Sequence, residues 1–285
     1  MFHRRLKVPL VTVELSFDGR FQLSTDDADI LVQLRSSSIL WQKERLLNLA
    51  LKSLPDSCDK VAWLDCDILF EDDGWVERAN RALDEVALLH LFQERNDLSR
   101  DFTSGNPGSW TSILKAQSVL YQLAIGETTT QELCAPIQPW KGSTAGLAWA
   151  GRRDILEEHG FYDACIVGAG DKAKLAAALG VFDAFTRSRP MNPRRTEHYV
   201  AWAKPYFNRV RGRVGHIPGV VFHLWHGDLA HRGIVERHRQ FEQFDFDPYK
   251  DIALDCNGCW RWNSEKPEMQ EFVRQYFASR KEDGV

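Results

Sequence analysis

The sequence has no apolar run long enough to cross a bilayer and no signal peptide at its start. A membrane-spanning helix needs about 18 or more consecutive apolar residues. The opening stretch, MFHRRLKVPLVTVELSFDGR, lacks the apolar segment and the small-residue cleavage site of a signal peptide. We therefore expect a cytoplasmic protein without an integral membrane segment.

Cysteine is sparse, with six residues scattered over a chain of 285. This spacing excludes the dense disulfide framework of a small secreted scaffold, so we expect reduced thiols. Cys256 and Cys259 form a C-x-x-C, but no second pair stands at zinc-ligand spacing. A turn at CNGC is therefore favoured over a structural zinc site.

An excess of basic charge, an internal repeat and a low-complexity linker are also missing. The net charge is -4, with 44% hydrophobic and 27% charged residues. This composition is typical of a globular protein with a sizeable core. Because no global positive field would attract a polyanion, we expect no nucleic-acid partner.

Strand-like and helix-like patterns alternate in the first half of the chain. The β-type runs cover residues 8–15, 28–34, 61–64 and 86–92, and the helical patterns cover 41–54 and 75–84. Alternation of this kind predicts an α/β fold, Rossmann-like, with a mainly parallel sheet flanked by helices. Later helices are expected at 171–180, ending at Gly180, and near 267–280, where an apolar stripe would dock on the body of the protein.

The run VAWLDCD, residues 61–67, ends a buried strand in two carboxylates. Alternate side chains of an extended chain point to the same side, so Asp65 and Asp67 would project together and could bind one cation. Oxygen ligands suit Mg²⁺ or Mn²⁺. A strand end that turns into solvent is the simpler alternative, because Asp-x-Asp is a common pattern.

The longer stretch WQKERLLNLALKSLPDSCDKVAWLDCDILF, residues 41–70, resembles a region of GT-A fold glycosyltransferases. In that superfamily, Arg and Asn of a helix lie near the nucleotide-sugar, and the following Asp-x-Asp binds the metal and contacts the donor. The resemblance implies nucleotide-sugar contacts for Arg45, Asn48 and Asp65, and metal binding for Asp65 and Asp67. Lys43 would assist the nucleotide contacts, although a solvated helix face explains this lysine equally well.

A second stretch, KGSTAGLAWAGRRDILEEHGFYDACIVGAGDKAKLAAAL, looks like the C-terminal half of the same catalytic domain. In inverting members an acidic residue here takes the proton of the acceptor hydroxyl, and Asp171 is the matching position. Many relatives carry Glu-Asp or Asp-Asp where this chain has Gly170 and Asp171. An ordinary helix N-cap is the alternative role for Asp171.

Histidines cluster in the last third of the chain. Many GT-A enzymes complete the metal shell with a histidine after a late strand, and GVVFH places His223 there, with His226 as a competitor. Two carboxylates and one imidazole would leave open metal positions for phosphate oxygens. The whole cluster comprises His216, His223, His226, His231 and His238.

Residues 187–216 are rich in basic and aromatic side chains. Eight Lys or Arg residues accompany one acid, Glu197. Basic groups could offset a diphosphate, while Tyr199, Trp202, Tyr206 and Phe207 could stack on sugars. Single-stranded nucleic acid and a plain solvated loop are the alternatives.

The resemblance covers roughly residues 5–240 and implies a GT-A-like domain at 1–240 with a C-terminal helical extension at 241–285. The family generally begins with a strand that touches the nucleotide, whereas HRRLKVPLVTVEL looks more like the end of the first helix and the second strand. The resemblance therefore leads us to expect a shortened N-terminus without the first βα unit, and with part of the nucleotide wall absent.

The resemblance implies a glycosyltransferase that uses Mn²⁺ or Mg²⁺ to move a sugar from a nucleotide-diphosphate donor, a UDP-sugar, to a carbohydrate or other hydroxyl acceptor. The alternatives are a catalytically silent sugar- or nucleotide-binding relative and a nucleotidyltransferase.

Overall fold

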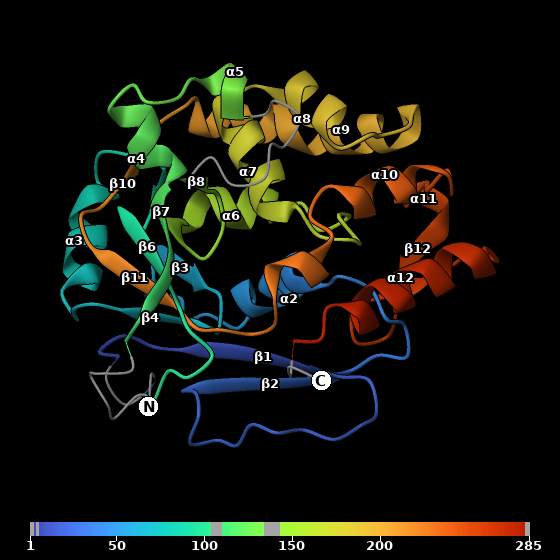
Figure 1. Ribbon diagram of the computed structural model, residues 1–285, viewed down its shortest axis with the longest axis horizontal. Helices are drawn as coiled ribbons and strands as arrows, with labels where there is room; N and C mark the ends of the chain where they lie inside the picture. Colours follow the sequence, from blue (N-terminus) through green and yellow to red (C-terminus); the bar gives the residue numbers. More distant parts are fainter. Residues whose placement is uncertain (1–2, 4–5, 104–109, 134–142, 283–285) are drawn as a thin grey trace.

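The computed structural model describes residues 3, 6–103, 110–133 and 143–282, which form four separate β-sheets and a set of helices (Figure 1). One sheet has four strands in the order β10-β5-β9-β3. β9 runs antiparallel between β3 and β5, and β10 is parallel to β5. The strands are β3 (Lys60–Leu64), β5 (Leu88–His90), β9 (Ala148–Arg152) and β10 (Val214–His216).

Large apolar side chains hold this sheet together across the β3–β9 pair. Trp63 and Trp149 are partners in the register, and their rings lie parallel with centroids 6.4 Å apart. Gly151 permits this packing, because a Cβ there would lie 2.8 Å from Leu88 Cδ2. The small residue in β9 thus lets three strands pack closely.

After β3 the chain continues into β4, the first strand of a five-stranded sheet in the order β4-β11-β6-β7-β8. Only residues 65–67 separate β3 from β4, so the two sheets meet at the Asp65–Asp67 turn. β11 is antiparallel to β4 and parallel to β6, which puts His223 opposite both Ile68 and Asp97. The strands are β4 (Ile68–Phe70), β6 (Glu94–Leu98), β7 (Ser112–Ser118), β8 (Ser143–Thr144) and β11 (Val220–His223).

Two small sheets complete the β-structure. β1 (Val11–Ser16) and β2 (Ile30–Arg35) form a parallel pair, and β12 (Ile252–Leu254) and β13 (Trp260–Trp262) form a hairpin. The CNGC segment lies in the turn of this hairpin, where Asp255 N–H donates to Cys259 O. The expected turn is confirmed. Cys58, Cys66, Cys165, Cys256 and Cys259 are free thiols, and Cys134 lies outside the described residues.

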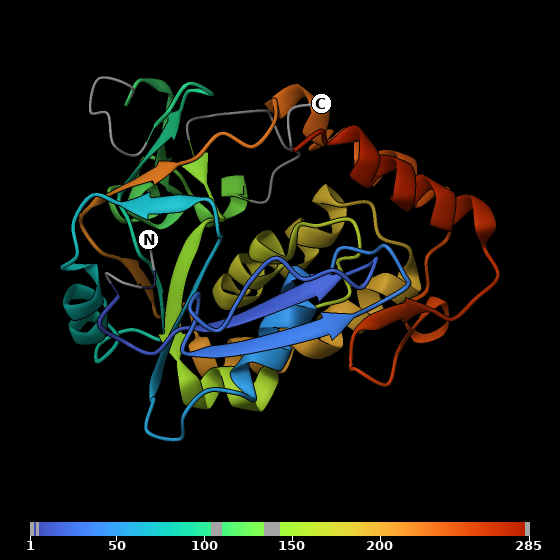
Figure 2. The same ribbon diagram turned by 90° about the horizontal axis from the view of Figure 1, so that it is seen from below.

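The helices gather mainly on one side of the four-stranded sheet, as the two views show (Figures 1 and 2). Alanine makes up four of the seven buried residues of α7, so α9 packs closely against it and Tyr199 OH donates to Ala173 O. The helices are α2 (Lys43–Leu51), α3 (Trp75–Ala82), α4 (Val119–Ala124), α5 (Thr130–Leu133), α6 (Arg153–His159), α7 (Gly170–Leu179), α8 (Phe182–Ser188), α9 (Pro193–Val210), α10 (Glu236–Glu242), α11 (Pro248–Asp251) and α12 (Pro267–Ser279), with a 3₁₀ turn, η2, at Leu229–Arg232.

The C-terminal helix docks as its pattern predicts. Met269 and Val273 of α12 are fully buried, Tyr276 is nearly so, and Phe272 and Phe277 pack against the same core. The end of α7 is also confirmed, because Gly180 adopts a left-handed conformation with φ +74°. Among the described residues, no helix is both long and apolar enough to cross a membrane.

Two expectations need correction. The α/β class is confirmed, but both larger sheets are mixed, because β9, β4 and β7 each run antiparallel to a neighbour. Alternation of strands and helices along the chain does not fix strand direction.

The aromatic residues of the 187–216 segment are not free stacking surfaces either. Tyr199 and Tyr206 are fully buried, and Trp202 stacks on Tyr206. The amphipathic period of α9 turns these rings into the core, so the sequence pattern reflected packing rather than ligand binding.

Candidate metal centre and adjoining charge cluster

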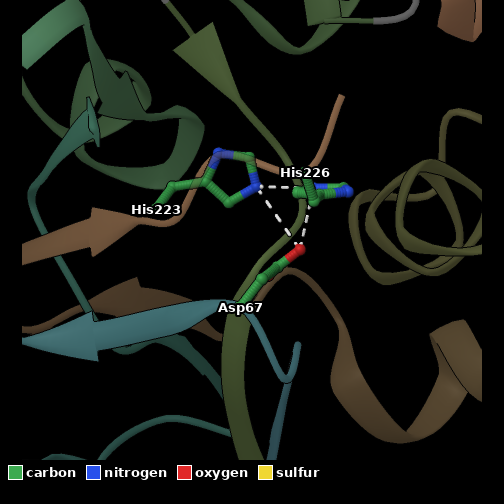
Figure 3. Close-up of side chains that lie close together, drawn as sticks. All are labelled: Asp67, His223 and His226. Atoms are coloured by element: carbon green, nitrogen blue, oxygen red, sulfur yellow. Dashed lines mark hydrogen bonds and ion pairs between the residues drawn. The ribbon is translucent and has the colours of Figure 1, made fainter. Parts of the chain in front are cut away.

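Asp67, His223 and His226 converge on one point (Figure 3). Oδ2 of Asp67 lies 2.8 Å from Nε2 of His226 and 3.6 Å from Nε2 of His223. The two Nε2 atoms are 3.2 Å apart. Asp67 comes from the β3–β4 turn, His223 from the end of β11 and His226 from the loop that follows, so the β4–β11 pairing builds the group.

Each imidazole turns its other nitrogen towards a second carboxylate. His223 Nδ1 lies 3.0 Å from Asp97 Oδ1, and His226 Nδ1 lies 3.3 Å from Glu282 Oε1. Asp97 is itself held by two hydrogen bonds from Arg95. Histidine ligands of metals characteristically donate their second N–H to a carboxylate or carbonyl in this way.

Contacts within the triad shift the pKa values of Asp67 and His226. Burial opposes ionisation of Asp67, yet hydrogen bonds from the two histidines lower its pKa well below the usual range. The hydrogen bond to Asp67 and the one to Glu282 raise the pKa of His226 to about 9. In the part of the chain that the structure describes, Asp67 Oδ1 is buried and accepts no hydrogen bond. A divalent cation bound by these side chains would offset the charge of Asp67 and displace protons from the imidazoles.

The donor set narrows the choice of metal. Two imidazoles and one carboxylate suit Mn²⁺, Fe²⁺ or Zn²⁺ better than Mg²⁺, which prefers oxygen ligands. The carboxylate and His226 side chains are 22% and 23% exposed, so open positions would face solvent. The residues present therefore fit a cation with substrate-accessible positions.

Asp65 belongs to a different cluster from Asp67. Its Oδ1 lies 2.5 Å from Lys43 Nζ, which also contacts Asp171 Oδ2 at 3.0 Å. Lys174 Nζ contacts the other oxygen of Asp171 at 3.3 Å. The chain leaves the β-strand conformation after Leu64, so the two aspartates do not share one strand face as expected. Lys43, Asp65 and Asp171 meet in this cluster, and Asp65 lies outside the metal triad.

The charge cluster packs against two tryptophan rings through Lys174. The Lys174 ammonium, 4% exposed, lies 4.1 Å from the ring centroid of Trp149 and 4.3 Å from that of Trp63. Burial lowers the pKa of Lys174 to about 8. Burial would raise the pKa of Asp171, but Lys43 and Lys174 together lower it to about 2. Asp171 is thus a fixed anion at neutral pH.

The alternative role of Asp171 as a helix cap is not borne out. Asp171 lies in the first turn of α7, whose N-cap position is Ala169. Ala169 has φ +87°, and Leu147, next to the cluster, has φ +81°. Leu147 O accepts the Asp65 N–H, so strained backbone lies on both sides of the carboxylate pair. Strain of this kind gathers at functional sites more often than elsewhere.

Glu44 takes the space of a side chain at position 170. A Cβ at position 170 would overlap Glu44 Oε1. Trp41 Nε1 donates to Glu44 Oε2, and burial raises the pKa of this glutamate to about 7. A carboxylate from α2 therefore stands where the GT-A resemblance places an acidic residue before Asp171. The pattern of α2 alone did not single out Glu44.

Arg45 and Asn48 lie outside both clusters. Arg45 pairs with Asp163 at 3.2 Å and donates to Gly258 O, and Asn48 donates to Asp163 and to Phe161 O. These contacts brace the turn before α7 rather than face an open site. The expectation that both side chains contact a nucleotide therefore finds no support in their hydrogen bonds.

The remaining histidines have local roles. His216 packs edge-on against Tyr121, His231 is exposed, and His238 is buried beside Arg237. Two of the five histidines that cluster in the sequence, His223 and His226, therefore lie in the candidate metal site. Asp97 and Glu282 were missed, because they are distant in sequence and only strand register and the C-terminal segment bring them to the triad. Arg232, six residues after His226, was also missed, although it contacts His226 Nε2.

Comparisons of the chain with protein-family models, with curated proteins and with solved structures gave no match. The two clusters and the resemblance of the motif stretches are therefore the grounds for a functional proposal.

Proposed function

We propose that the protein is a metal-dependent glycosyltransferase that moves a sugar from a nucleotide-diphosphate donor to an acceptor hydroxyl. One observation carries this proposal: the turn at residues 65–67 supplies Asp67 to a triad with two histidines and Asp65 to a charge cluster with Asp171. A candidate cation site and a cluster of charged side chains thus adjoin. The GT-A resemblance of the two motif stretches supports the same assignment.

In this proposal Asp67, His223 and His226 hold the cation. When bound, a divalent ion would offset the negative charge of a diphosphate leaving group. Lys43 fixes Asp65 and Asp171 in place, and the side chains of these three residues are 22–26% exposed. They can therefore contact a substrate directly, with Asp65 and Asp171 accepting hydrogen bonds from sugar hydroxyls.

Two carboxylates, Asp171 and Glu44, are candidates for the general base that takes the proton of the acceptor hydroxyl. Asp171 is accessible, but a carboxylate with a pKa of about 2 is a weak base at neutral pH. Glu44, with a pKa of about 7, has suitable basicity, but only 5% of its surface is exposed. Asp171→Asn and Glu44→Gln variants separate the two, because loss of the true base removes the acidic limb of the pH–rate profile, where the rate rises as the base loses its proton.

The donor set alone favours a second candidate. Two histidines and one carboxylate with open positions also occur in non-haem Fe(II) oxygenases. The adjoining Lys43–Asp65–Asp171 cluster favours binding of a polar, hydroxyl-rich substrate instead. A silent sugar-binding relative would keep both clusters, and a nucleotidyltransferase would bind the nucleotide and release pyrophosphate.

Calorimetric titration with UDP and UDP-sugars, with and without Mn²⁺, tests the proposal. We expect donor binding that requires Mn²⁺ and slow donor hydrolysis in the absence of acceptor. Absent or Mn²⁺-independent binding would overturn the glycosyltransferase assignment. Tight binding without hydrolysis or transfer would indicate the silent relative, and Fe²⁺-dependent oxygen uptake would indicate the oxygenase.

A further inference from the structure

The carboxylate of Glu282 reaches the metal triad from the C-terminal end of the described chain. Its Oε1 lies 3.3 Å from His226 Nδ1, on the far side of the ring from Asp67. The Glu282 side chain is 44% exposed, so it covers the triad from outside rather than from the core. More than fifty residues separate Glu282 from His226, so tertiary packing alone brings the two together.

The segment that carries Glu282 is anchored at defined points. Arg280 is 8% exposed, lies over Trp41 at 4.8 Å, and hydrogen-bonds both Tyr276 OH and Glu282. Because Arg280 contacts Trp41 just before α2 and Tyr276 of α12 as well as Glu282, the carboxylate is held by the body of the protein. Its position is not that of a loose chain end.

Gly227 lies against the backbone of residues 280–282. It has φ +88°, and a Cβ there would lie 2.8 Å from Lys281 O and 3.0 Å from Arg280 O. A side chain at 227 would therefore push the 280–282 backbone away from the loop that carries His226. The loop and the C-terminal segment are matched to each other at this position.

A cation bound at Nε2 of His226 would fix the tautomer of this ring. Nε2 lies 2.8 Å from Asp67 Oδ2 and 2.8 Å from Arg232 Nη2. Coordination through the Nε2 lone pair leaves the ring proton on Nδ1, which faces Glu282. Asp97 lies behind Nδ1 of His223 in the same way.

We propose that Glu282 is a positioning residue of the metal centre, which fixes the Nδ1–H tautomer of His226 and thereby makes metal affinity depend on the seating of residues 280–282. This inference rests on the metal site of the proposed function. It does not depend on the donor, the acceptor or the reaction.

Mn²⁺ titration of the full chain by calorimetry tests the role of Glu282. We expect Glu282→Ala to weaken Mn²⁺ binding about tenfold, in the range typical of carboxylates behind a histidine ligand, and Glu282→Gln to weaken it less, because its amide oxygen still accepts from Nδ1. Glu271→Ala is the matched control, since Glu271 pairs with Arg274 on the outside of α12. It should bind Mn²⁺ like the wild type.

Gly227→Ala provides an independent route, because it displaces the segment without altering any carboxylate or ligand. It should weaken Mn²⁺ binding as Glu282→Ala does. The pH at which Mn²⁺ binding is half-maximal should also move in Glu282→Ala and stay unchanged in the control, which a purely structural role would not produce.

The outcomes are distinguishable. If Glu282→Ala binds Mn²⁺ as tightly as the wild type while Asp67→Asn does not bind it, the metal site stands and the role of Glu282 is refuted. Failure of the wild type to bind Mn²⁺, Fe²⁺ or Zn²⁺ would overturn both this inference and the proposed function.

Discussion

The Nε2 atoms of His223 and His226 lie 3.2 Å apart, within hydrogen-bonding distance of each other. Each ring has a carboxylate behind it, and the carboxylate of Asp67 faces both. Without a metal, a proton must mediate between the rings. With a divalent cation, all three side chains can act as ligands through lone pairs that already point inward.

Asp67→Asn should remove most of the metal affinity. The substitution replaces the anionic ligand by a neutral amide, so we expect Mn²⁺ binding to weaken on the order of 100-fold or more, since loss of a ligand exceeds the effect of an outer-shell change. Calorimetry measures the change. Asp72→Asn is the control, because this nearby carboxylate pairs with Arg78 on the surface. Equal effects of the two substitutions would contradict the assignment of the triad.

Metal affinity should rise with pH. The pKa of His226 is raised to about 9 in the metal-free protein, so a proton competes with the cation below that pH. We expect Mn²⁺ binding to tighten from about pH 6 to about pH 9 and to release protons. Titrations in buffers of different ionisation enthalpy count those protons. Affinity that is flat over this range would contradict binding through His226.

Lys174→Met should destabilise the fold. Removal of one member of a buried ion pair typically costs about 3–5 kcal/mol, and Lys43 remains to compensate Asp171, so we expect about 3 kcal/mol. Urea unfolding measures the free energy. Lys204→Met, at an exposed position of α9, should change it by less than about 0.5 kcal/mol. A stable Lys174→Met protein would show that the cluster is well solvated.

Gly170→Ala should be harmful only while Glu44 is present. The added methyl would overlap the Glu44 carboxylate, and overpacking typically costs about 1–3 kcal/mol. In a Glu44→Ala background the same substitution should be nearly neutral, because the space is vacant. A double-mutant cycle in urea measures this coupling. Additive effects would mean that Glu44 moves away easily.

Glu44 should make stability fall as the pH rises. Burial raises its pKa from 4.5 to about 7 on folding, so the folded state binds this proton more tightly than the unfolded chain does. Below pH 4.5 both states are protonated and the full stability is present. Between pH 4.5 and pH 7 the free energy of unfolding falls, with a slope of at most about 1.4 kcal/mol per pH unit. Glu44→Gln should therefore gain stability relative to the wild type across this window. Unfolding curves at several pH values give the difference, and parallel curves for the two proteins would contradict the raised pKa.

Much of the fold could be predicted from local patterns. The apolar period of α12, the glycine that ends α7 and the strand before Asp65 all follow from short-range sequence. Strand direction could not be predicted, because β9 pairs antiparallel with two strands that are distant in sequence. The interpretation of the α9 aromatic residues as stacking surfaces was wrong, since the same spacing serves a buried face and a ligand surface.

The sequence by itself determined which chemical groups are present and where the strand that delivers Asp65 and Asp67 ends. It also determined that histidines follow β11, so His223 and His226 were recognisable as ligand candidates. Tertiary structure decided which of these groups lie in the metal triad and which lie in the charge cluster. The turn after Leu64 directs Asp65 to Lys43 and Asp67 to the histidines, strand register brings Asp97, and the C-terminal segment brings Glu282. The physical reason is that side-chain spacing fixes direction only within one regular element, whereas this site joins a turn, two strands and the C-terminal segment.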